Sequence, residues 1–357
     1  MLHAVIMAGG SGTRFWPASR QSRPKQFLEL ATDTPLLRMT FERLGSLVPP
    51  ERVWVVTTAA TAEATHEVLP ELPAHNVLAE PVGRNTAACA GFAAHTVLAQ
   101  DSEAVCIVLP ADHVIGDVSR FCSAMEAGAR LVEREGGLLT FGVQPTRPET
   151  GYGYLELGPE HSHDGEWAIH RLQRFVEKPD ADHARRYMES RRFLWNAGIF
   201  AWRAGDLLEE LRRQLPELAE GLGRLAASLE TADAETVLAE VYPTLPATSV
   251  DFGVMEKAEG CWTIPVDFPW SDVGSWSALA EALPGDSSDN HGHGRVHAVD
   301  SHGNVLVSTG PALSVVGIND LVVVATPDAV LVVPKDEAQR VKDVVEALQE
   351  KGWNDVL

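Results

Sequence analysis

Cysteine is scarce in this sequence, which has four among 357 residues, at Cys89, Cys106, Cys122 and Cys261. They lie far apart among apolar or small residues, which argues against a disulfide framework or a zinc site and favours buried free thiols in a reducing compartment. Long apolar runs are also missing, so no segment approaches the length of a membrane span. The first residues lack a basic stretch and reach glycine too early for a signal peptide. These absences predict a cytoplasmic protein without a membrane partner.

Basic residues are in deficit, with 29 lysines and arginines against 50 aspartates and glutamates, so the formal net charge is −21. Such a surface repels nucleic acid and anionic membranes, and we expect neither as a partner. It would also repel a nucleoside triphosphate, unless a local basic cluster and a divalent cation reverse the field at the site. The length allows one large α/β domain with a smaller partner domain.

Short apolar runs alternate with helical patterns through most of the chain, which is typical of a mostly parallel sheet with helices on both faces. Strands are predicted at 3–7, 52–57, 76–79, 104–109, 137–143, 153–157, 171–176, 198–202 and 261–267. Helices are predicted at 35–47 and 118–135, and over 205–241 with an interruption at Pro216. The expected fold class is α/β, with a Rossmann-like, mixed but mostly parallel sheet flanked by helices.

The pattern changes after about residue 285. Residues 285–294 predict a flexible linker, and metal binding by their His-Gly-His-Gly stretch is the less favoured alternative. Beyond them, short strands at 304–307, 312–318, 321–326 and 329–333 precede an amphipathic helix at about 336–351, which indicates a small β-solenoid. We therefore predict two domains, 1–284 and 285–357. The second has too few repeats to stand alone, so we expect it to pack on the first; its apolar edges make a homodimer plausible.

The strongest signal follows the first strand, where a glycine-rich loop is composed of Gly9, Gly10, Ser11, Gly12 and Thr13. Glycines allow the backbone to approach a ligand closely and to direct N–H groups at phosphate oxygens. Four cations follow within twelve residues, namely Arg14, Arg20, Arg23 and Lys25. A tight turn with solvated charges is the simpler alternative, but this density of cations in an acidic chain favours anion binding.

Two familiar phosphate-binding patterns do not fit this loop. The Walker pattern requires Gly-Lys-Ser/Thr, whereas Gly12 is followed by Thr13 and Arg14. The dinucleotide fingerprint G-x-G-x-x-G begins at Gly10 but meets Phe15 where its third glycine should stand. A nicotinamide-dependent dehydrogenase is thereby weakened, though it stays an alternative.

Acidic and amide side chains follow several later strands. Asp112 ends an apolar strand, at the sheet edge where α/β proteins bind ligands, although a cap or turn residue is the alternative. Asp272 lies in a second such turn. Asn85 is suited to cap an Ala-rich helix. Glu177 and Lys178 follow another strand. They are interpreted either as a pair that binds a ligand or as solvated charges.

The loop with its Arg-Phe-Trp-Pro and Pro-Lys-Gln-Phe elements resembles the signature of the sugar-nucleotide pyrophosphorylases, in particular their mannose-1-phosphate guanylyltransferase branch. The similarity runs through nearly the whole chain, and the later motifs occur in the family's order. It implies formation of GDP-mannose and pyrophosphate from GTP and mannose 1-phosphate with Mg2+. One departure is Ala88, which stands where the family often has proline.

The resemblance also implies roles for particular residues. Arg14 and Lys25 would act on the triphosphate and the transition state, and Asp112 and Asp272 would bind Mg2+. The nucleotide would be bound by Gly9, Gly10, Ser11, Gly12, Thr13, Glu80, Arg84, Asn85 and Thr86, with Glu80 facing guanine through its side chain or its backbone carbonyl. The sugar phosphate would be bound by Gly153, Glu177, Lys178 and Asn196. His113 and the block 249–257, with Ser249 as a cap, are expected to be mostly structural.

Three alternatives remain beside this interpretation. One is the same chemistry with another sugar or base, the second is the dehydrogenase, and the third is a non-catalytic nucleotide-sugar sensor. A sensor would be expected to lack Arg14, Lys25 or the acid pair, and all are present. Some family members carry an additional isomerase domain; this chain lacks a suitable histidine cluster, so transferase activity alone is expected.

Overall fold

The computed structural model describes residues 1–10, 12–30 and 32–357, and this part of the chain packs as two compact units. Unit 1 consists of residues 1–9, 41–110 and 115–270, and unit 2 consists of residues 10–40, 111–114 and 271–357. Each unit therefore combines segments that are distant in the sequence. This division differs from the predicted domain boundary at 284, which stays a prediction.

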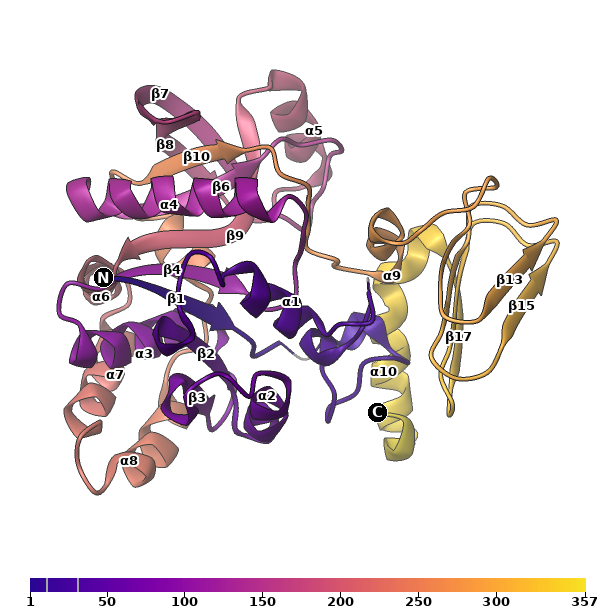
Figure 1. The fold of residues 1–357 in the computed structure, drawn as a ribbon, viewed down its shortest axis with the longest axis horizontal. Coiled ribbons are helices and arrows are strands. Elements are labelled where there is room, and N and C mark those ends of the chain that lie inside the picture. The colour runs from indigo at the N-terminus through magenta and orange to yellow at the C-terminus, as the bar shows by residue number, and fades with distance from the viewer. Residues whose placement is uncertain (11, 31) are drawn as a thin grey trace. The chain divides into compact units, whose positions relative to one another are not determined.

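Unit 1 is built on one nine-stranded sheet in the order β3-β2-β1-β4-β9-β6-β10-β8-β7 (Figure 1). Its strands are β1 (Leu2–Met7), β2 (Val53–Thr58), β3 (Val77–Glu80), β4 (Val105–Pro110), β6 (Leu138–Val143), β7 (Tyr154–Asp164), β8 (Trp167–Val176), β9 (Phe193–Arg203) and β10 (Trp262–Val266). Strands β3, β2, β1 and β4 run parallel to one another, whereas β9 is antiparallel to both β4 and β6. The predicted mixed, mostly parallel sheet is confirmed for this half of the unit.

Helices cover both faces of the sheet. They are α2 (Ala62–Val68), α3 (Asn85–Gln100), α4 (Val118–Glu135), α5 (Ala181–Ser190), α6 (Ala204–Gln214), α7 (Pro216–Ser228) and α8 (Ala234–Val241). Gly128 of α4 lies against Leu139 and Phe141, whereas Leu138 belongs to the apolar cluster of α3, α6 and α7. Because successive side chains of a strand point to opposite faces, α4 lies on one face and the α3 group on the other.

Local sequence explains where several helices begin and end. Helix α4 has the predicted bounds, because the carboxylate of Asp117 accepts from the Arg120 N–H and Gly136 adopts a positive φ of 70° after its last turn. The stretch predicted as one interrupted helix forms three. Pro216 begins α7, since proline fits the first helical position, where its missing N–H is not needed.

Unit 2 contains a small coil of parallel strands. Its elements are β12 (His291–His293), β13 (Val296–Val299), β14 (Val305–Ser308), β15 (Leu313–Val316), β16 (Leu321–Ala325), β17 (Val330–Pro334), α9 (Trp276–Leu279) and α10 (Val341–Glu350). The register pairs His291 with Val305 and Val305 with Val322, so successive coils stack. The predicted β-solenoid-like region is confirmed. Three short elements lie where the chain passes between the units: α1 (Leu36–Arg43), β5 (Val114–Ile115) and β11 (Trp270–Ser271).

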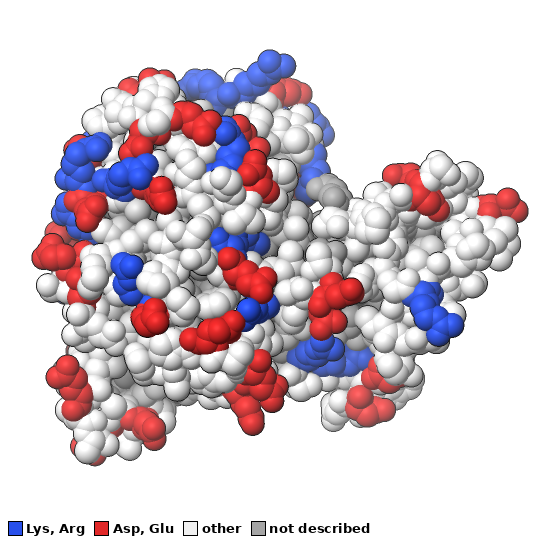
Figure 2. Space-filling view, viewed as in Figure 1, with Lys and Arg blue, Asp and Glu red and all other residues white. Residues whose placement is uncertain are grey.

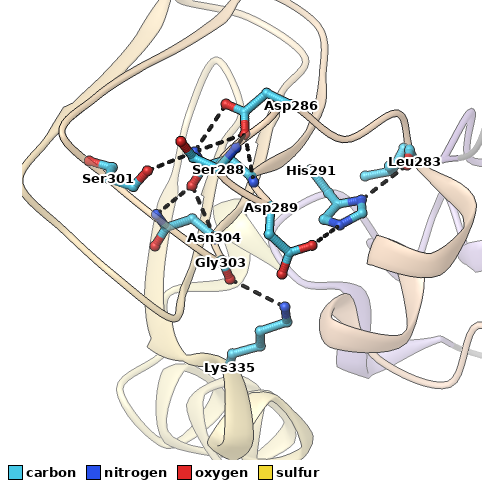
Figure 3. Close-up of polar contacts among 10 residues, drawn as sticks. Leu283, Asp286, Ser288, Asp289, His291, Ser301, Gly303, Asn304 and Lys335 are labelled. Atoms are coloured by element: carbon cyan, nitrogen blue, oxygen red, sulfur yellow. Dashed lines mark hydrogen bonds and ion pairs between the residues drawn. The ribbon is translucent and has the colours of Figure 1, made fainter.

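The linker predicted at 285–294 is wrong, because this segment is ordered by side-chain amides (Figure 3). Asp286 accepts from the N–H groups of Ser288 and Asn290 at 2.8 and 3.0 Å. The amide of the fully buried Asn304 donates to Asn290 Oδ1 at 2.8 Å, and its own oxygen accepts from Leu321 N. Asparagine and glycine, which are typical of turns, here stabilise successive coils.

The apolar core of unit 2 joins both ends of the chain. Phe15, Trp16 and Leu28 belong to one buried cluster with residues of the strand coil and of α10, among them Val322 and Val345. The ring centroids of Phe15 and Trp276 lie 5.0 Å apart, and Trp16 Nε1 donates to Val356 O at 2.7 Å. The early glycine-rich segment thus depends on the C-terminal residues for its packing.

The prediction of buried free thiols is confirmed. All four cysteines are buried and free, and no described helix has the length and apolarity needed to cross a bilayer. On the face shown in Figure 2, acidic and basic side chains are interspersed rather than gathered into one patch. Among the ion pairs of unit 1, Arg120 donates to Asp267 and Glu166.

Candidate active site

The glycine-rich segment of unit 2 folds back on Lys25. Gly12 has a positive φ of 61°, and a Cβ atom built there would clash with Lys25 Cβ and lie only 2.8 Å from Lys25 N. Ser19 Oγ donates to the Gly12 carbonyl at 2.8 Å and closes the loop. Only glycine satisfies both the conformation and the close approach at this position.

Lys25 lies between the two predicted metal ligands. Its ammonium donates to Asp112 Oδ2 at 2.9 Å and to the backbone carbonyl of Asp272 at 2.7 Å. The Lys25 side chain is 6% exposed and that of Asp112 is 35% exposed, so solvent reaches the carboxylate of the ion pair but hardly the ammonium. Burial alone would raise the pKa of Asp112, but the charges of Lys25 and, secondarily, His113 hold it below its ordinary value.

One cavity of about 320 Å³ collects these groups. It is lined by Gly12, Thr13, Arg14, Phe15, Lys25, Asp112, His113, Asp272, Val273 and Gly274. The structure therefore brings together the predicted catalytic pair and the predicted metal pair, although 160 residues separate Asp112 from Asp272 in the sequence. His113, which we expected to be structural, also lines the cavity.

The carboxylates present suit Mg2+ in number and type. Mg2+ usually takes one or two protein carboxylates and completes its octahedron with substrate phosphate and water. Asp112 and Asp272 supply two, and no group of three or more His, Cys, Asp or Glu side chains suited to a metal occurs among the described residues. Asp272 Oδ1 also accepts from Gly274 N at 3.1 Å, which orients the carboxylate. The donor set fits an ion that binds together with a phosphate substrate.

Of the remaining predicted nucleotide residues, Gly10 lies in unit 2, whereas Gly9, Glu80, Arg84, Asn85 and Thr86 lie in unit 1. Ser11 is not among the described residues. Gly9 lies close to Glu80, since a Cβ at Gly9 would be 3.1 Å from Glu80 Oε2. Glu80 is 3% exposed and accepts a hydrogen bond from the Tyr242 hydroxyl, so its carboxylate is turned into unit 1. Of the two contacts to guanine considered above, this geometry favours the backbone carbonyl.

Arg84, Asn85 and Thr86 surround the start of α3. Asn85 has a positive φ of 65°, and its side-chain oxygen accepts from Thr86 N at 2.8 Å. The Thr86 hydroxyl accepts from Val250 N at 2.9 Å and so ties the helix to the 248–250 loop. Arg84 Nε is buried without a hydrogen-bond partner in the described structure. Asn85 and Thr86 thus have structural roles, and their predicted nucleotide contacts stay predictions.

Burial of Glu80 leads to a prediction about stability. Burial raises the pKa of Glu80 to about 7, while the Tyr242 hydrogen bond opposes part of this change. Between its ordinary pKa of 4.5 and about 7 the folded state keeps a proton that the unfolded state releases, so stability falls as pH rises through this window. Glu80→Gln should remove this loss, on the order of 3 kcal/mol. Urea unfolding at a series of pH values across this window checks it, with the exposed Glu67→Gln as control; parallel curves for wild type and Glu80→Gln would contradict it.

The predicted sugar-phosphate residues form a second polar cluster, within unit 1. Lys178 Nζ donates to Glu177 Oε1 at 2.6 Å, and the Lys178 side chain is 62% exposed. A Cβ at Gly153 would lie 2.7 Å from Glu177 Oε2, so glycine leaves room for that carboxylate. Asn196 is 8% exposed, and its amide oxygen accepts from the hydroxyl of Thr140 at 2.8 Å. The structure brings all four predicted residues into one neighbourhood.

Asp251 belongs to this cluster and was missed by the sequence analysis. Its Oδ1 accepts from Asn196 Nδ2 at 2.8 Å, and burial, followed by the charge of Glu177, raises its pKa to about 6. The expected cap is present, because Ser249 Oγ accepts from Phe252 N. Glu256 of the same block accepts from Glu177 N at 2.7 Å. In the sequence, the only sign of this arrangement is that Asp251 and Glu256 are five residues apart. Acidic residues on the exposed face of a helix give the same spacing.

A family model described as nucleotidyl transferase matches residues 3–288, and one described as MannoseP isomerase/GMP-like beta-helix domain matches residues 294–348. A mannose-1-phosphate guanylyltransferase of Salmonella muenchen is 38% identical over 98% of this chain and 74% of its own length. The alginate biosynthesis protein AlgA of Pseudomonas aeruginosa is 36% identical over 98% and 72%. A crystal structure described as mannose-1-phosphate geranyltransferase, from Thermus thermophilus, has a TM-score of 0.87 at 39% identity, covering 98% of this chain and 99% of that one.

Proposed function

Since this chain belongs to the nucleotidyl transferase family, we propose that it forms GDP-mannose and pyrophosphate from GTP and mannose 1-phosphate. The observation that carries the proposal is the cavity in which Arg14 and Lys25 meet Asp112 and Asp272. Cations for phosphate oxygens and paired carboxylates for Mg2+ are the two requirements of phosphoryl-type transfer. The names of the relatives supply the choice of guanine and mannose.

The nucleophile is a phosphate oxygen of mannose 1-phosphate. A phosphate monoester is largely dianionic at neutral pH, because its second pKa is about 6. The attacking oxygen therefore needs no protein base, and His113 is not assigned that role. The oxygen attacks the α-phosphorus of GTP, the bond from that phosphorus to the bridging oxygen breaks, and pyrophosphate leaves with the bond electrons.

Catalysis then depends on positioning and on stabilising negative charge. Arg14 is exposed in the cavity and is assigned to the triphosphate. Lys25 neutralises Asp112 in the ligand-free chain and is assigned to the phosphate charge that develops during transfer. Asp112 and Asp272 would hold Mg2+, and the ion would supply positive charge that neutralises the phosphate groups.

Sugar binding is assigned to the cluster of unit 1. Glu177 would accept hydrogen bonds from sugar hydroxyls, Lys178 would contact the sugar phosphate, and Gly153 would donate its backbone N–H. The amide oxygen of Asn196 accepts from Thr140, and its amide nitrogen donates one hydrogen to Asp251. The second amide hydrogen is assigned to a sugar hydroxyl. A cytoplasmic location and a homodimer are also proposed; Val330 and Val332, each 61% exposed on β17 at the end of its sheet, support association.

The metal requirement gives a direct test. Excess EDTA should abolish pyrophosphate release from GTP with mannose 1-phosphate, because Asp112 and Asp272 cannot neutralise phosphate charge without the ion. Added Mg2+ should restore the rate. The same assay with ATP or dTTP, and with glucose 1-phosphate, tests the selectivity. Full activity in excess EDTA would rule out the metal role of the two aspartates, and no turnover of GTP with mannose 1-phosphate would rule out the proposed reaction.

A further inference from the structure

Arg20, one of the four cations that follow the glycine-rich loop, is not among the residues that line the candidate active-site cavity. It lines a second cavity of unit 2, of about 440 Å³, between residues 17–30 and the C-terminal β region. Its side chain is 14% exposed. Nη2 donates to both carboxylate oxygens of Asp328 at 2.9 and 3.0 Å, and Nη1 donates to the carbonyls of Pro17 and Ser19. Arg20 therefore joins the glycine-rich segment to Asp328.

Asp328 is held in a tight turn. The turn connects β16 to β17, and Thr326 Oγ1 donates to Asp328 Oδ1 at 2.7 Å. The same hydroxyl accepts from Ala329 N at 3.1 Å, and Thr326 N donates to Ala329 O at 2.9 Å. Two paired strands and these local bonds fix the carboxylate, so it presents a rigid partner to the guanidinium of Arg20.

Hydrogen bonds lead from Arg20 to the active-site cavity. The Ser19 backbone carbonyl accepts from Arg20, and the Ser19 hydroxyl donates to Gly12 O at 2.8 Å. Gly12 in turn packs on Lys25. On the other side, the backbones of Arg20 and Arg23 exchange two hydrogen bonds of 3.0 and 3.1 Å, closing the turn that leads to Lys25. A displacement of Arg20 would therefore displace both Gly12 and Lys25, which line the active-site cavity.

From these contacts we infer that Asp328 is a positioning residue for the transfer reaction, acting through Arg20 on the segment that carries Arg14 and Lys25. The inference rests on the proposed function. A partly exposed ion pair adds little to global stability. Its effect on rate is larger, because small displacements of groups that stabilise a transition state are costly. The C-terminal β region would thereby contribute to catalysis without contacting substrate.

The test compares Asp328→Asn, Arg20→Gln and the double variant in the full chain. Each single variant should lower kcat by about tenfold with little change in KM for GTP. The double variant should lose no more than either single one, since both remove the same interaction. Amide hydrogen exchange in residues 12–27 should become faster in all three. Asp164→Asn is the matched control, because it breaks a bidentate pair with Arg130 in unit 1 and should change neither readout.

Unchanged kcat and unchanged exchange in Asp328→Asn would overturn the inference, as would strictly additive losses in the double variant. If Asp328→Asn fails to fold, Asp328→Glu, which keeps the carboxylate, decides the matter: a folded chain with slowed turnover and faster exchange at 12–27 supports positioning, and normal values contradict it. Failure of the proposed function is distinguished by the wild type, which would then release no pyrophosphate, while the exchange comparison still tests whether Asp328 orders the segment.

Discussion

Arg14→Ala should lower kcat by two orders of magnitude or more, about 3 kcal/mol of barrier, with the fold intact. The reason is its place in the cavity: Arg14 is exposed there, with Lys25 and the two aspartates in the same lining. Its charge is available to a triphosphate, and truncation removes no packed side chain. Steady-state pyrophosphate release and thermal unfolding, measured on the same preparation, check both parts.

The control for Arg14 is Arg23→Ala in the same segment. The Arg23 side chain is 56% exposed, 3.8 Å from Glu29, and lines the second cavity instead. It should therefore have little effect on turnover. Near-normal turnover of a folded Arg14→Ala would remove the main cation from the proposed mechanism, and equal losses in both variants would indicate a general effect of charge.

Lys25→Met should have a larger effect, because it changes rate and stability together. The variant removes the ammonium group that is assigned to the phosphate charge developing during transfer, so we expect a loss on the order of a thousandfold in kcat. It also leaves Asp112 and the Asp272 carbonyl without their partner. The ion pair also contributes to stability. Asp112 has a lowered pKa in the folded state, so its contribution is present above its ordinary pKa and is lost as pH falls through the folded value.

This linkage can be measured. Lys25→Met should lower the free energy of unfolding at neutral pH by about 1 to 2 kcal/mol, less than for a fully buried pair, because Asp112 is 35% exposed. The difference from wild type should shrink as pH falls below the ordinary aspartate pKa of 3.8. Lys351→Met serves as control, since its ammonium only lies over the exposed ring of Trp353. A stability difference that persists unchanged at low pH would contradict the role of Asp112.

Part of the cavity could be predicted, because the glycine-rich loop, its cations and Asp112 lie in motifs whose chemistry is local. A glycine loop with dense cations favours anion binding over a plain tight turn, and Asp112 follows a readily identified strand. The partnership of Asp251 with Asn196 could not be predicted, since no local pattern says which carboxylate a distant amide will meet. Asp272 was predicted from the order of the family's motifs. The periodicity of apolar residues does not reveal where Asp272 lies in the fold.

The errors at 285–294 and 205–241 have different physical causes. Composition suggested a linker at His291, but pairing with β14 and the buried amide of Asn304 outweigh the turn preferences of glycine and asparagine. In the helical stretch, the second break lies at residues 229–233, where no proline marks it. Tertiary pairing therefore explains the segment at 285–294, and the break at 229–233 has no marker in the sequence pattern.

The shared core of unit 2 has a consequence for synthesis of the protein. Phe15 and Trp16 are synthesised long before Val341 and Val345, which belong to the same buried cluster. At ordinary translation rates the two groups are separated by roughly 20 to 60 seconds. For that time the glycine-rich segment lacks its packing partners, so Phe15 and Trp16 are exposed to solvent and to chaperones. The candidate active site is therefore completed only after the residues of α10 have been made, however early its first residues appear.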